Sequence, residues 1–433
     1  MKLTHYFFLF LLFANASFAQ QKKPNIIFVL ADDLGIDGVS AYGADFFKTP
    51  VIDKLAKEGI RYTNAYTVPL CGPSRALILS GRYGFRTGAV NQDMTSEIKP
   101  SAENFMPSIL KKAGYATSMI GKWGQLPLDP GAFGFEDYLR FFGSGSYVNE
   151  AGKKDKYVVN GKEAVLKDGE YMPDLMHDHM VNFLAKHKKD PFYLYYSLSH
   201  VHGEIVATPD TKPGTSDYKD LYADNISYMD KLVGKLVHTL DSLKLRENTL
   251  IVFFGDNGTA GEAAQIGRVQ GQKLSGKKGT MQECGSLVPM IVNWPAMIKK
   301  PGVSNSLIDA ADFIPTFAEL AGAPLPTNNV LDGVSFAYQL KGGKGTAREW
   351  IFTGLGKDWY VRSANWKLMR SGDLYDMRKA PFEEKLVVLD DKTTAEKQKL
   401  QAVLDKLNPA GGFLDNGDGS GRHANKTKNK EKK

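Results

Sequence analysis

Four hydrophobic runs along the chain each end abruptly in charged, amide or imidazole side chains. The runs are NIIFVLADD at 25–33, ATSMIGKW at 116–123, PFYLYYSLSHVH at 191–202 and TLIVFFGDNG at 249–258. They are rich in β-branched and aromatic residues and nearly continuous, which is typical of buried parallel strands. Amphipathic helical patterns occupy the chain between these runs, at 50–60, 106–115 and 224–244. This alternation predicts an α/β fold with a mixed, mainly parallel central sheet between helices.

The polar residues that end these runs are candidates for one common site. They are Asp32 and Asp33, Lys122, His200 and His202, and Asp256 and Asn257. In open α/β sheets, ligands bind beyond the carboxyl ends of the strands, so we expect these side chains to converge there. Carboxylate and amide oxygens suit Ca²⁺ or Mg²⁺ better than zinc. Loop or helix-cap roles for the acidic residues are the alternative.

One of only two cysteines stands in the segment VPLCGPSRALILSGR, residues 68–82. Pro73 and the residues after it favour a helix that begins near Cys71. A helix N-terminus attracts anions and makes a thiol more acidic, so Cys71 is a candidate nucleophile or part of an anion pocket. A buried structural cysteine is the alternative, and a disulfide with Cys284 also stays open.

Composition and the chain ends indicate an exported protein. Residues 1–19 have the early lysine, short apolar core and small residues of a cleaved signal peptide, and no other run is long enough to cross a membrane. The formal charge is +7, of which Lys2 supplies +1 and residues 417–433 supply +4. The body is therefore nearly neutral, and we expect no nucleic-acid partner.

The composition also divides the mature chain. We expect a catalytic α/β domain over 20–345, a small antiparallel sheet with a helix over 346–410, and a disordered basic tail over 411–433. Two polar, glycine-rich stretches, 141–171 and 258–280, are predicted insertions, and the first has the pattern of a hairpin.

Several of these segments together resemble the type I sulfatases of the alkaline phosphatase superfamily. The resemblance rests on PNIIFVLADDLG, CGPSRALILSGR, GYATSMIGKW, FFGDNGT and KKGTMQECG, which occur in the family's order, and DLYDM resembles its C-terminal strand motif. It covers nearly the whole mature chain and implies the fold predicted above.

The resemblance implies a modified nucleophile. Cys71 would be oxidised by a sulfatase-maturating enzyme to Cα-formylglycine, whose hydrate has two hydroxyl groups. One hydroxyl attacks sulfur, and the other lets the sulfated intermediate collapse and expel sulfate.

The resemblance also assigns the surrounding residues. The implied ligands of a divalent cation, usually Ca²⁺, are Asp32, Asp33, Asp256, Asn257 and the modified Cys71. Arg75 would hold the formylglycine, and Lys122 and Lys278 would bind the sulfate oxygens. His202 would bind or protonate the leaving oxygen, with His200 as its alternative two residues earlier.

Two positions depart from the family pattern. Gly124 follows Gly-Lys-Trp where the family has a histidine that contacts the formylglycine, and Cys284 replaces a small residue and is expected to be a buried thiol without a catalytic role. His177 and His179, in MHDHM, are expected on the surface, because a spacing of two points them to different sides of a helix.

The sequence thus predicts an exported, periplasmic or extracellular sulfatase whose substrate is a sulfated carbohydrate. A phosphate or phosphonate ester hydrolase of the same superfamily and a non-catalytic binder of sulfated glycans are the alternatives.

Overall fold

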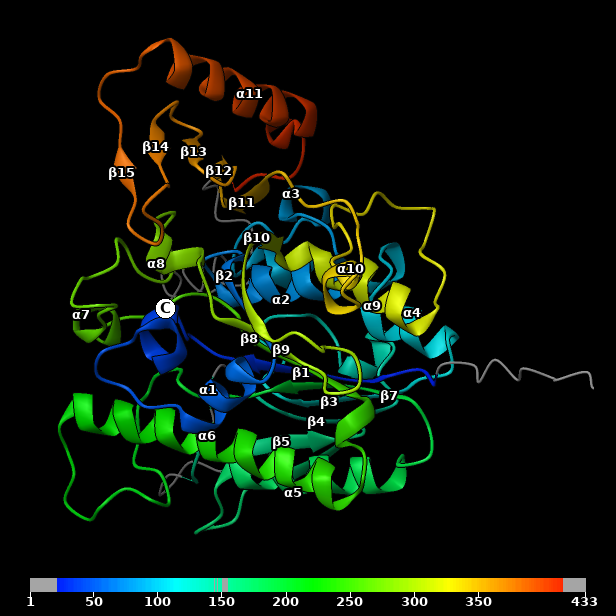
Figure 1. Ribbon diagram of the computed structural model, residues 1–433. Coiled ribbons are helices and arrows are strands. Elements are labelled where there is room, and N and C mark those ends of the chain that lie inside the picture. Colours follow the sequence, from blue (N-terminus) through cyan, green and yellow to red (C-terminus); the bar gives the residue numbers. More distant parts are fainter. Residues whose placement is uncertain (1–21, 144, 146, 150–154, 416–433) are drawn as a thin grey trace, which may run out of the picture.

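The central element of the protein is a ten-stranded mixed sheet, seen in a computed structural model that describes residues 22–143, 145, 147–149 and 155–415 (Figure 1). Its strand order is β10-β2-β9-β8-β1-β7-β3-β4-β5-β6. The strands are β1 Asn25–Ala31, β2 Ile60–Tyr66, β3 Ala116–Gly121, β4 Asp137–Phe141, β5 Lys156–Val159, β6 Lys162–Val165, β7 Phe192–Ser197, β8 Thr249–Gly255, β9 Met290–Asn293 and β10 Gly302–Asp309. The centre of the sheet, from β8 to β4, is parallel, whereas β9 and the β5–β6 hairpin pair antiparallel. The predicted fold class is confirmed.

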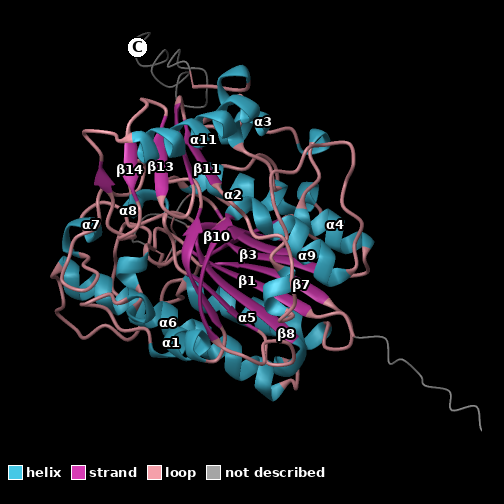
Figure 2. Cartoon of the chain, turned by 45° about the horizontal axis from the view of Figure 1, so that its top comes forward, coloured by secondary structure: helices cyan, strands magenta, loops and turns pink. Residues whose placement is uncertain are grey.

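Helices cover both faces of this sheet, as Figures 1 and 2 show. The helices are α1 Pro50–Lys57, α2 Cys71–Ser80, α3 Gly84–Thr87, α4 Met106–Lys112, α5 Met172–Lys186, α6 Tyr218–Ser242, α7 Ala263–Ile266, α8 Glu283–Ser286, α9 Phe313–Ala321, α10 Ala337–Leu340 and α11 Asp391–Leu407. Helices α2, α4 and α9 share one hydrophobic cluster, and α1, α5 and α6 share the other.

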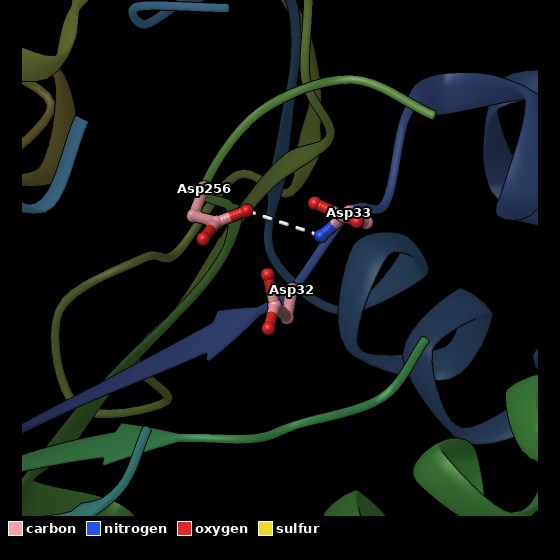
Figure 3. Close-up of side chains that lie close together, drawn as sticks. All are labelled: Asp32, Asp33 and Asp256. Carbon is pink, nitrogen blue, oxygen red and sulfur yellow. Dashed lines mark hydrogen bonds between the residues drawn. The ribbon is translucent and has the colours of Figure 1, made fainter. Parts of the chain in front are cut away.

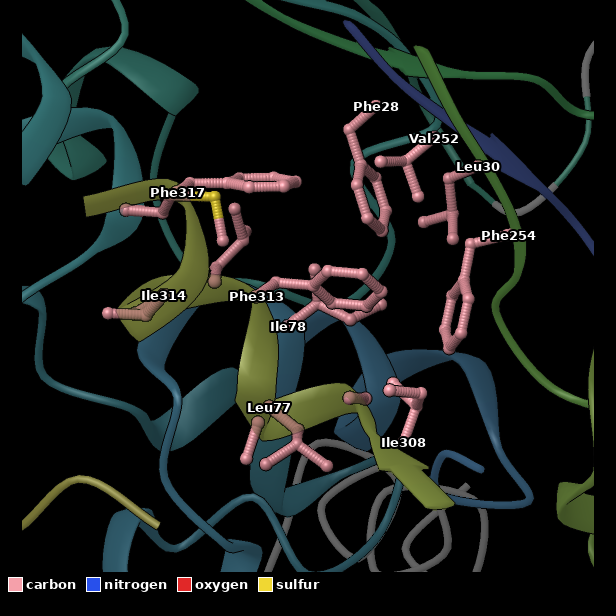
Figure 4. Packing of buried hydrophobic residues seen from close by; sticks show 14 of the residues in the cluster. Phe28, Leu30, Leu77, Ile78, Val252, Phe254, Ile308, Phe313, Ile314 and Phe317 are labelled. Carbon is pink, nitrogen blue, oxygen red and sulfur yellow. The ribbon is translucent and has the colours of Figure 1, made fainter. Parts of the chain in front are cut away.

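The strand sequences explain why both faces are covered. Successive side chains of a strand point to opposite faces, so a strand that is apolar throughout needs a partner on each side. In β1, Phe28 packs toward α2 and α9, where Phe313 lies with its ring centroid 4.7 Å away (Figure 4). Its neighbours Ile27 and Val29 pack in the cluster of α1, α5 and α6.

A second sheet of five antiparallel strands follows in the chain, in the order β11-β12-β13-β14-β15. Its strands are β11 Ile351–Leu355, β12 Asp358–Arg362, β13 Trp366–Met369, β14 Leu374–Asp376 and β15 Glu384–Lys385. Helix α11 packs on β12 and β13, and Leu400 and Leu404 of this helix join the cluster that also contains α2. The small antiparallel sheet expected at the C-terminal end is thus present.

The two predicted insertions fall largely within the described residues, whereas the predicted signal peptide and most of the predicted tail do not. The first insertion carries the expected hairpin, β5–β6, and the second contains only the short helix α7. The predicted signal peptide at 1–19, and the predicted tail beyond residue 415, lie outside the described residues. Within the part that the structure describes, no helix combines the length and apolarity needed to cross a bilayer.

Candidate active site

The candidate site is at the edge of the sheet where four parallel strands end together. The register pairs Ala31 of β1 with Gly255 of β8, Leu30 with Ser197 of β7, and Ser197 with Gly121 of β3. The residues that follow these strand ends therefore lie side by side. The four runs that the sequence singled out are the adjacent strands β8, β1, β7 and β3.

Three carboxylates converge at this edge, those of Asp32, Asp33 and Asp256 (Figure 3). They offer oxygens that all lie within 4.8 Å of one another, and all three residues are buried. The Asp33 amide donates a hydrogen bond of 3.1 Å to Asp256 Oδ1, which fixes the loop after β1 against the loop after β8. Burial and the neighbouring carboxylates raise the pKa of Asp32 well above its usual range, against the opposing effect of Lys122.

Two oxygens in this group have no hydrogen-bond donor. Asp32 Oδ1 and Asn257 Oδ1 are both fully buried without a partner. The Asn257 amide nitrogen donates 2.9 Å to Asp33 Oδ1, so the amide oxygen is its remaining free atom. Buried oxygens without donors are uncommon in proteins, and a cluster made only of oxygens fits a hard divalent cation. The predicted ligands Asp32, Asp33, Asp256 and Asn257 thus fit the cation that the resemblance implies.

Two lysines reach the carboxylates. Lys122 Nζ lies 2.5 Å from Asp32 Oδ2 with both side chains fully buried, and Lys278 Nζ lies 2.6 Å from Asp33 Oδ1. Burial lowers the pKa of each lysine, but the adjacent carboxylates outweigh it and raise both values above normal. Cys71 also contributes to both increases in pKa, so its side chain is within electrostatic reach of the two lysines.

Arg75 connects the strand ends. Its guanidinium donates to Asp256 Oδ2 at 2.7 and 3.0 Å, to the Lys122 carbonyl at 2.9 Å and to Ser197 Oγ at 2.5 Å. Asp256 follows β8, Lys122 follows β3, and Ser197 is the last residue of β7. Burial disfavours the charge of Arg75, but Asp256 holds its pKa above the normal value. Arg75 is therefore cationic and fixed in position by the residues that form the site.

Cys71 is the first residue of α2 and is buried, as the sequence predicted for the start of this helix. Gln92 Nε2 donates to Cys71 Sγ at 3.3 Å, and Gln92 Oε1 accepts from the Gly72 amide at 3.0 Å. Gln125 Oε1 in turn accepts from Gln92 Nε2 at 2.5 Å. Neither glutamine was predicted from the sequence. Gln92 lies in an irregular segment without a motif. Gln125 directly follows Gly124, which departs from the family pattern, and this place in the chain could have indicated it as a site residue.

The two candidate histidines lie in different surroundings. His202 Nε2 is 3.9 Å from Asp33 Oδ2, and its Nδ1 is 2.5 Å from the Gly203 carbonyl. Burial and the nearby Lys122 lower the pKa of His202 to about 4. The His200 ring is fully buried beside Tyr147, and its Nε2 is 3.0 Å from the Tyr171 hydroxyl. The structure therefore brings His202, and not His200, to the carboxylate group.

The reason is that β7 ends at Ser197. Strand alternation would have placed residues 200 and 202 on the same face, but the chain has left the sheet before it reaches them. Only the backbone of His200 contributes here, since its carbonyl accepts 2.9 Å from the Asp32 amide. Burial lowers the pKa of the His200 ring to about 3, so this ring is neutral within its aromatic surroundings.

The structure also places Gly124 and Cys284, the two positions that depart from the family pattern. Gly124 has φ of 77°, and a Cβ there would lie 3.4 Å from Arg75 Cδ. Cys71 and Cys284 are both unpaired and buried, so the disulfide left open by the sequence is not formed. Burial raises the pKa of the Cys284 thiol, as expected for an unreactive cysteine. The surface placement of His177 is wrong, because α5 packs with this residue against the protein interior.

Comparisons with known proteins agree with this geometry. The family model described as Sulfatase matches residues 24–323, and the model described as N-sulphoglucosamine sulphohydrolase, C-terminal, matches residues 276–410. The chain is 31% identical to an arylsulfatase of Hemicentrotus pulcherrimus, over 79% of this chain and 66% of that protein. It is 33% identical to the human N-acetylgalactosamine-6-sulfatase, over 76% of this chain and 68% of that protein.

A solved structure extends the likeness to the whole fold. The crystal structure of Ps i-CgsB in complex with k-i-k-neocarrahexaose superposes with a TM-score of 0.77 at 28% identity. The match covers 89% of this chain and 93% of that chain, so it includes both sheets.

Proposed function

This chain belongs to the sulfatase family of sulfuric ester hydrolases, and we propose that it is exported and removes sulfate esters from carbohydrate with a formylglycine made from Cys71. The family match and the named relatives support the reaction class. The carbohydrate part rests on the N-acetylgalactosamine-6-sulfatase relatives, and export rests on the signal-like residues 1–19. A sulfatase-maturating enzyme is the partner that the modification of Cys71 requires.

The observation that carries the proposal is the composition of one buried site. It combines a cysteine at the first position of α2, three converging carboxylates, two buried oxygens without a hydrogen-bond donor (Asp32 Oδ1 and Asn257 Oδ1), and two lysines that contact the carboxylates. A formylglycine at residue 71 supplies a hydrated aldehyde with two hydroxyl groups, one for attack on sulfur and one for release of sulfate. A bound Ca²⁺ or Mg²⁺ supplies charge neutralisation and makes an oxygen nucleophile more acidic.

The lysines bind the anionic group. Lys122 and Lys278 each contact a carboxylate of the group and are within electrostatic reach of residue 71, so both ammonium groups can attract a sulfate that approaches this residue. Fixed cations in a buried site stabilise charge that develops on sulfate oxygens more strongly than they would in water. Lys278 retains 16% exposure of its side chain, so it lies at the open side of the site, and the fully buried Lys122 lies at its base.

Two further side chains orient the reacting groups. His202 turns Nδ1 toward the Gly203 carbonyl, so Nε2 is the atom available to the leaving oxygen of the substrate, and it must take up a proton before it can donate one. Gln92 contacts the sulfur of Cys71, and we assign to it the orientation of the oxygen that replaces this sulfur. Gln125 directly follows Gly124, so its hydrogen bond with Gln92 links the segment that lacks the family's histidine to residue 71.

Mass spectrometry of the peptide containing residue 71, taken from the native host, tests the proposal directly. We expect the aldehyde form at Cys71 and the unmodified thiol at Cys284, which serves as the internal control. Cys71→Ala is expected to abolish hydrolysis of sulfated N-acetylgalactosamine, and Cys284→Ala to retain it. An exclusively thiol form of Cys71 would falsify the mechanism.

The two alternative functions have their own readouts. A phosphate or phosphonate ester hydrolase would cleave an aryl phosphate faster than the matching aryl sulfate. A non-catalytic glycan binder would carry an intact site yet release no sulfate from any member of a sulfated-sugar panel. We expect the aryl sulfate to be the better substrate, since the named relatives are sulfatases.

A further inference from the structure

A cationic cleft lies apart from the catalytic residues, between the edge of the large sheet and the small sheet. It has a volume of about 610 Å³ and is lined from β2, β10, β12 and the segment 377–382. It adjoins a second cavity of about 460 Å³, with which it shares Asn305, Ala364, Asn365 and Arg378. Neither lining includes a residue of the candidate active site, so this groove is a separate place on the molecule.

The charge of the cleft has one sign. The larger cavity is lined by Arg61, Arg362, Arg378 and Lys379, and no aspartate or glutamate lines it. Arg378 is ion-paired with Asp376. Within the described part of the chain, Arg61 and Lys379 have no carboxylate at ion-pair distance. The guanidinium of Arg61 lies over the ring of Tyr42, 5.1 Å from its centroid. The lining therefore presents positive charge that protein carboxylates leave uncompensated.

Arg362 gives independent support, because it is fully buried and lines this cleft. Its two terminal nitrogens donate to the Tyr66 hydroxyl and to Asn64 Oδ1, whereas its Nε has no partner. Glu283 reaches it only through that hydroxyl and lies 3.3 Å from Lys367 as well. A buried cation without a direct carboxylate partner is costly, so a bound anion would stabilise this position.

The remaining polar groups favour a sugar as the carrier of the anion. The side-chain amides of Gln270 and Asn365 lie among the cations and offer both donors and acceptors, whereas those of Asn64 and Asn305 already bond to Arg362 and Thr63. Hydroxyl groups of a sugar need such groups, whereas an inorganic ion or a lipid phosphate needs only the cations. The cleft continues into the smaller cavity, whose lining adds Arg348 and Lys392 but also Glu349 and Glu396. The joined cavities suit a chain better than a single ion, with its anionic groups in the larger cavity.

We propose that this cleft binds an anionic segment of a sulfated polysaccharide and so holds the polymer while the catalytic site acts on it. The choice of a sulfated glycan rests on the proposed function, but the binding itself does not require catalysis. Failure of binding and failure of hydrolysis are therefore separate results.

The test compares two double variants that remove the same charge. Arg61→Gln/Lys379→Gln alters the cleft, and Lys188→Gln/Lys189→Gln alters two exposed lysines after α5. Affinity electrophoresis in gels containing dextran sulfate, with neutral dextran as the reference, measures binding. We expect the cleft variant to bind dextran sulfate about 30-fold more weakly, since each of its two removed cations contributes about 1 kcal/mol near an anionic surface. We expect the control variant to bind normally, and both to hydrolyse a small aryl sulfate at the wild-type rate.

Four results would overturn the proposal. If the cleft variant bound dextran sulfate with wild-type affinity, the cleft would be excluded as the binding site. If both double variants lost the same affinity, the effect would be one of overall charge. Displacement of all bound dextran sulfate by inorganic sulfate, at the same concentration of sulfate groups, would indicate a site for a simple ion. Stronger binding to vesicles of phosphatidylglycerol than to dextran sulfate would indicate a lipid surface instead.

Discussion

Replacing Gln92 by leucine tests how the protein manages without the histidine missing at Gly124. The substitution removes the donor that contacts Cys71 Sγ at 3.3 Å and the acceptor for the Gly72 amide at 3.0 Å. A hydrogen bond to a neutral group contributes about 1 kcal/mol, and one to a charged group about 1.5–3 kcal/mol. Because the oxygen at residue 71 gains charge during the reaction, we expect kcat to fall by about tenfold to 100-fold.

The assay is steady-state hydrolysis of an aryl sulfate by enzyme whose formylglycine content has been measured by peptide mass spectrometry. Gln92 lies outside the segment from Cys71 to Arg75, so we expect equal modification in the variant and the wild type. Gln125→Leu is the matched control, since Gln125 contacts Gln92 and not Cys71. We expect Gln125→Leu to lower kcat by less than about fivefold, the effect of one neutral hydrogen bond. A wild-type kcat for Gln92→Leu at equal modification would refute the reasoning.

Three further predictions follow from the same geometry. Gly124→His is expected to destabilise the fold by about 1 kcal/mol in urea unfolding, because φ at this position is 77°. We expect no increase in kcat, and a rise in kcat would contradict the role given to Gln92. EDTA is expected to lower the melting temperature, and added Ca²⁺ is expected to restore it. A cation that binds only the folded state adds about 2.7 kcal/mol of stability at a concentration 100 times its dissociation constant. An unchanged melting temperature would speak against the cation site. Burial raises the pKa of Asp230 from 3.8 to about 6, so its contribution to stability is complete below pH 4 and is lost as pH rises through 6. Urea unfolding at pH 4.5 and 7 should show a decline in stability that is smaller in Asp230→Asn than in wild type, by about 2 kcal/mol. Asp220→Asn on the same helix should decline as wild type does.

The sequence predicted the parts of the fold whose pattern is strong. The runs that became β1, β3, β7 and β8 are apolar on both faces, and only a sheet covered on both sides satisfies that pattern. The start of α2 at Cys71 was predictable as well, because proline favours the first turn of a helix. Both predictions depend on local chemistry, which a single sequence contains.

The missed features depend on contacts between distant segments. Gln92 reaches Cys71 across 20 residues of chain through an irregular segment, and amide side chains have no periodicity that would indicate such a contact. His200 was a candidate because the strand was assumed to continue, whereas β7 ends three residues before it. His177 lies on a helix whose packing against the sheet decides its exposure, and spacing alone does not determine that packing.

Arg75 explains how one helix can position Cys71, the proposed nucleophile, relative to Asp256, a proposed metal ligand. It lies one turn after Cys71, so α2 fixes the two residues relative to each other. Its guanidinium then bonds to Asp256 at the end of β8 and to the Lys122 carbonyl at the end of β3. A shift of α2 would therefore break contacts to two strands at once, and a buried, unpaired guanidinium would be costly. The position of residue 71 relative to Asp256 is thus set by the fold itself, through the helix that carries both Cys71 and Arg75.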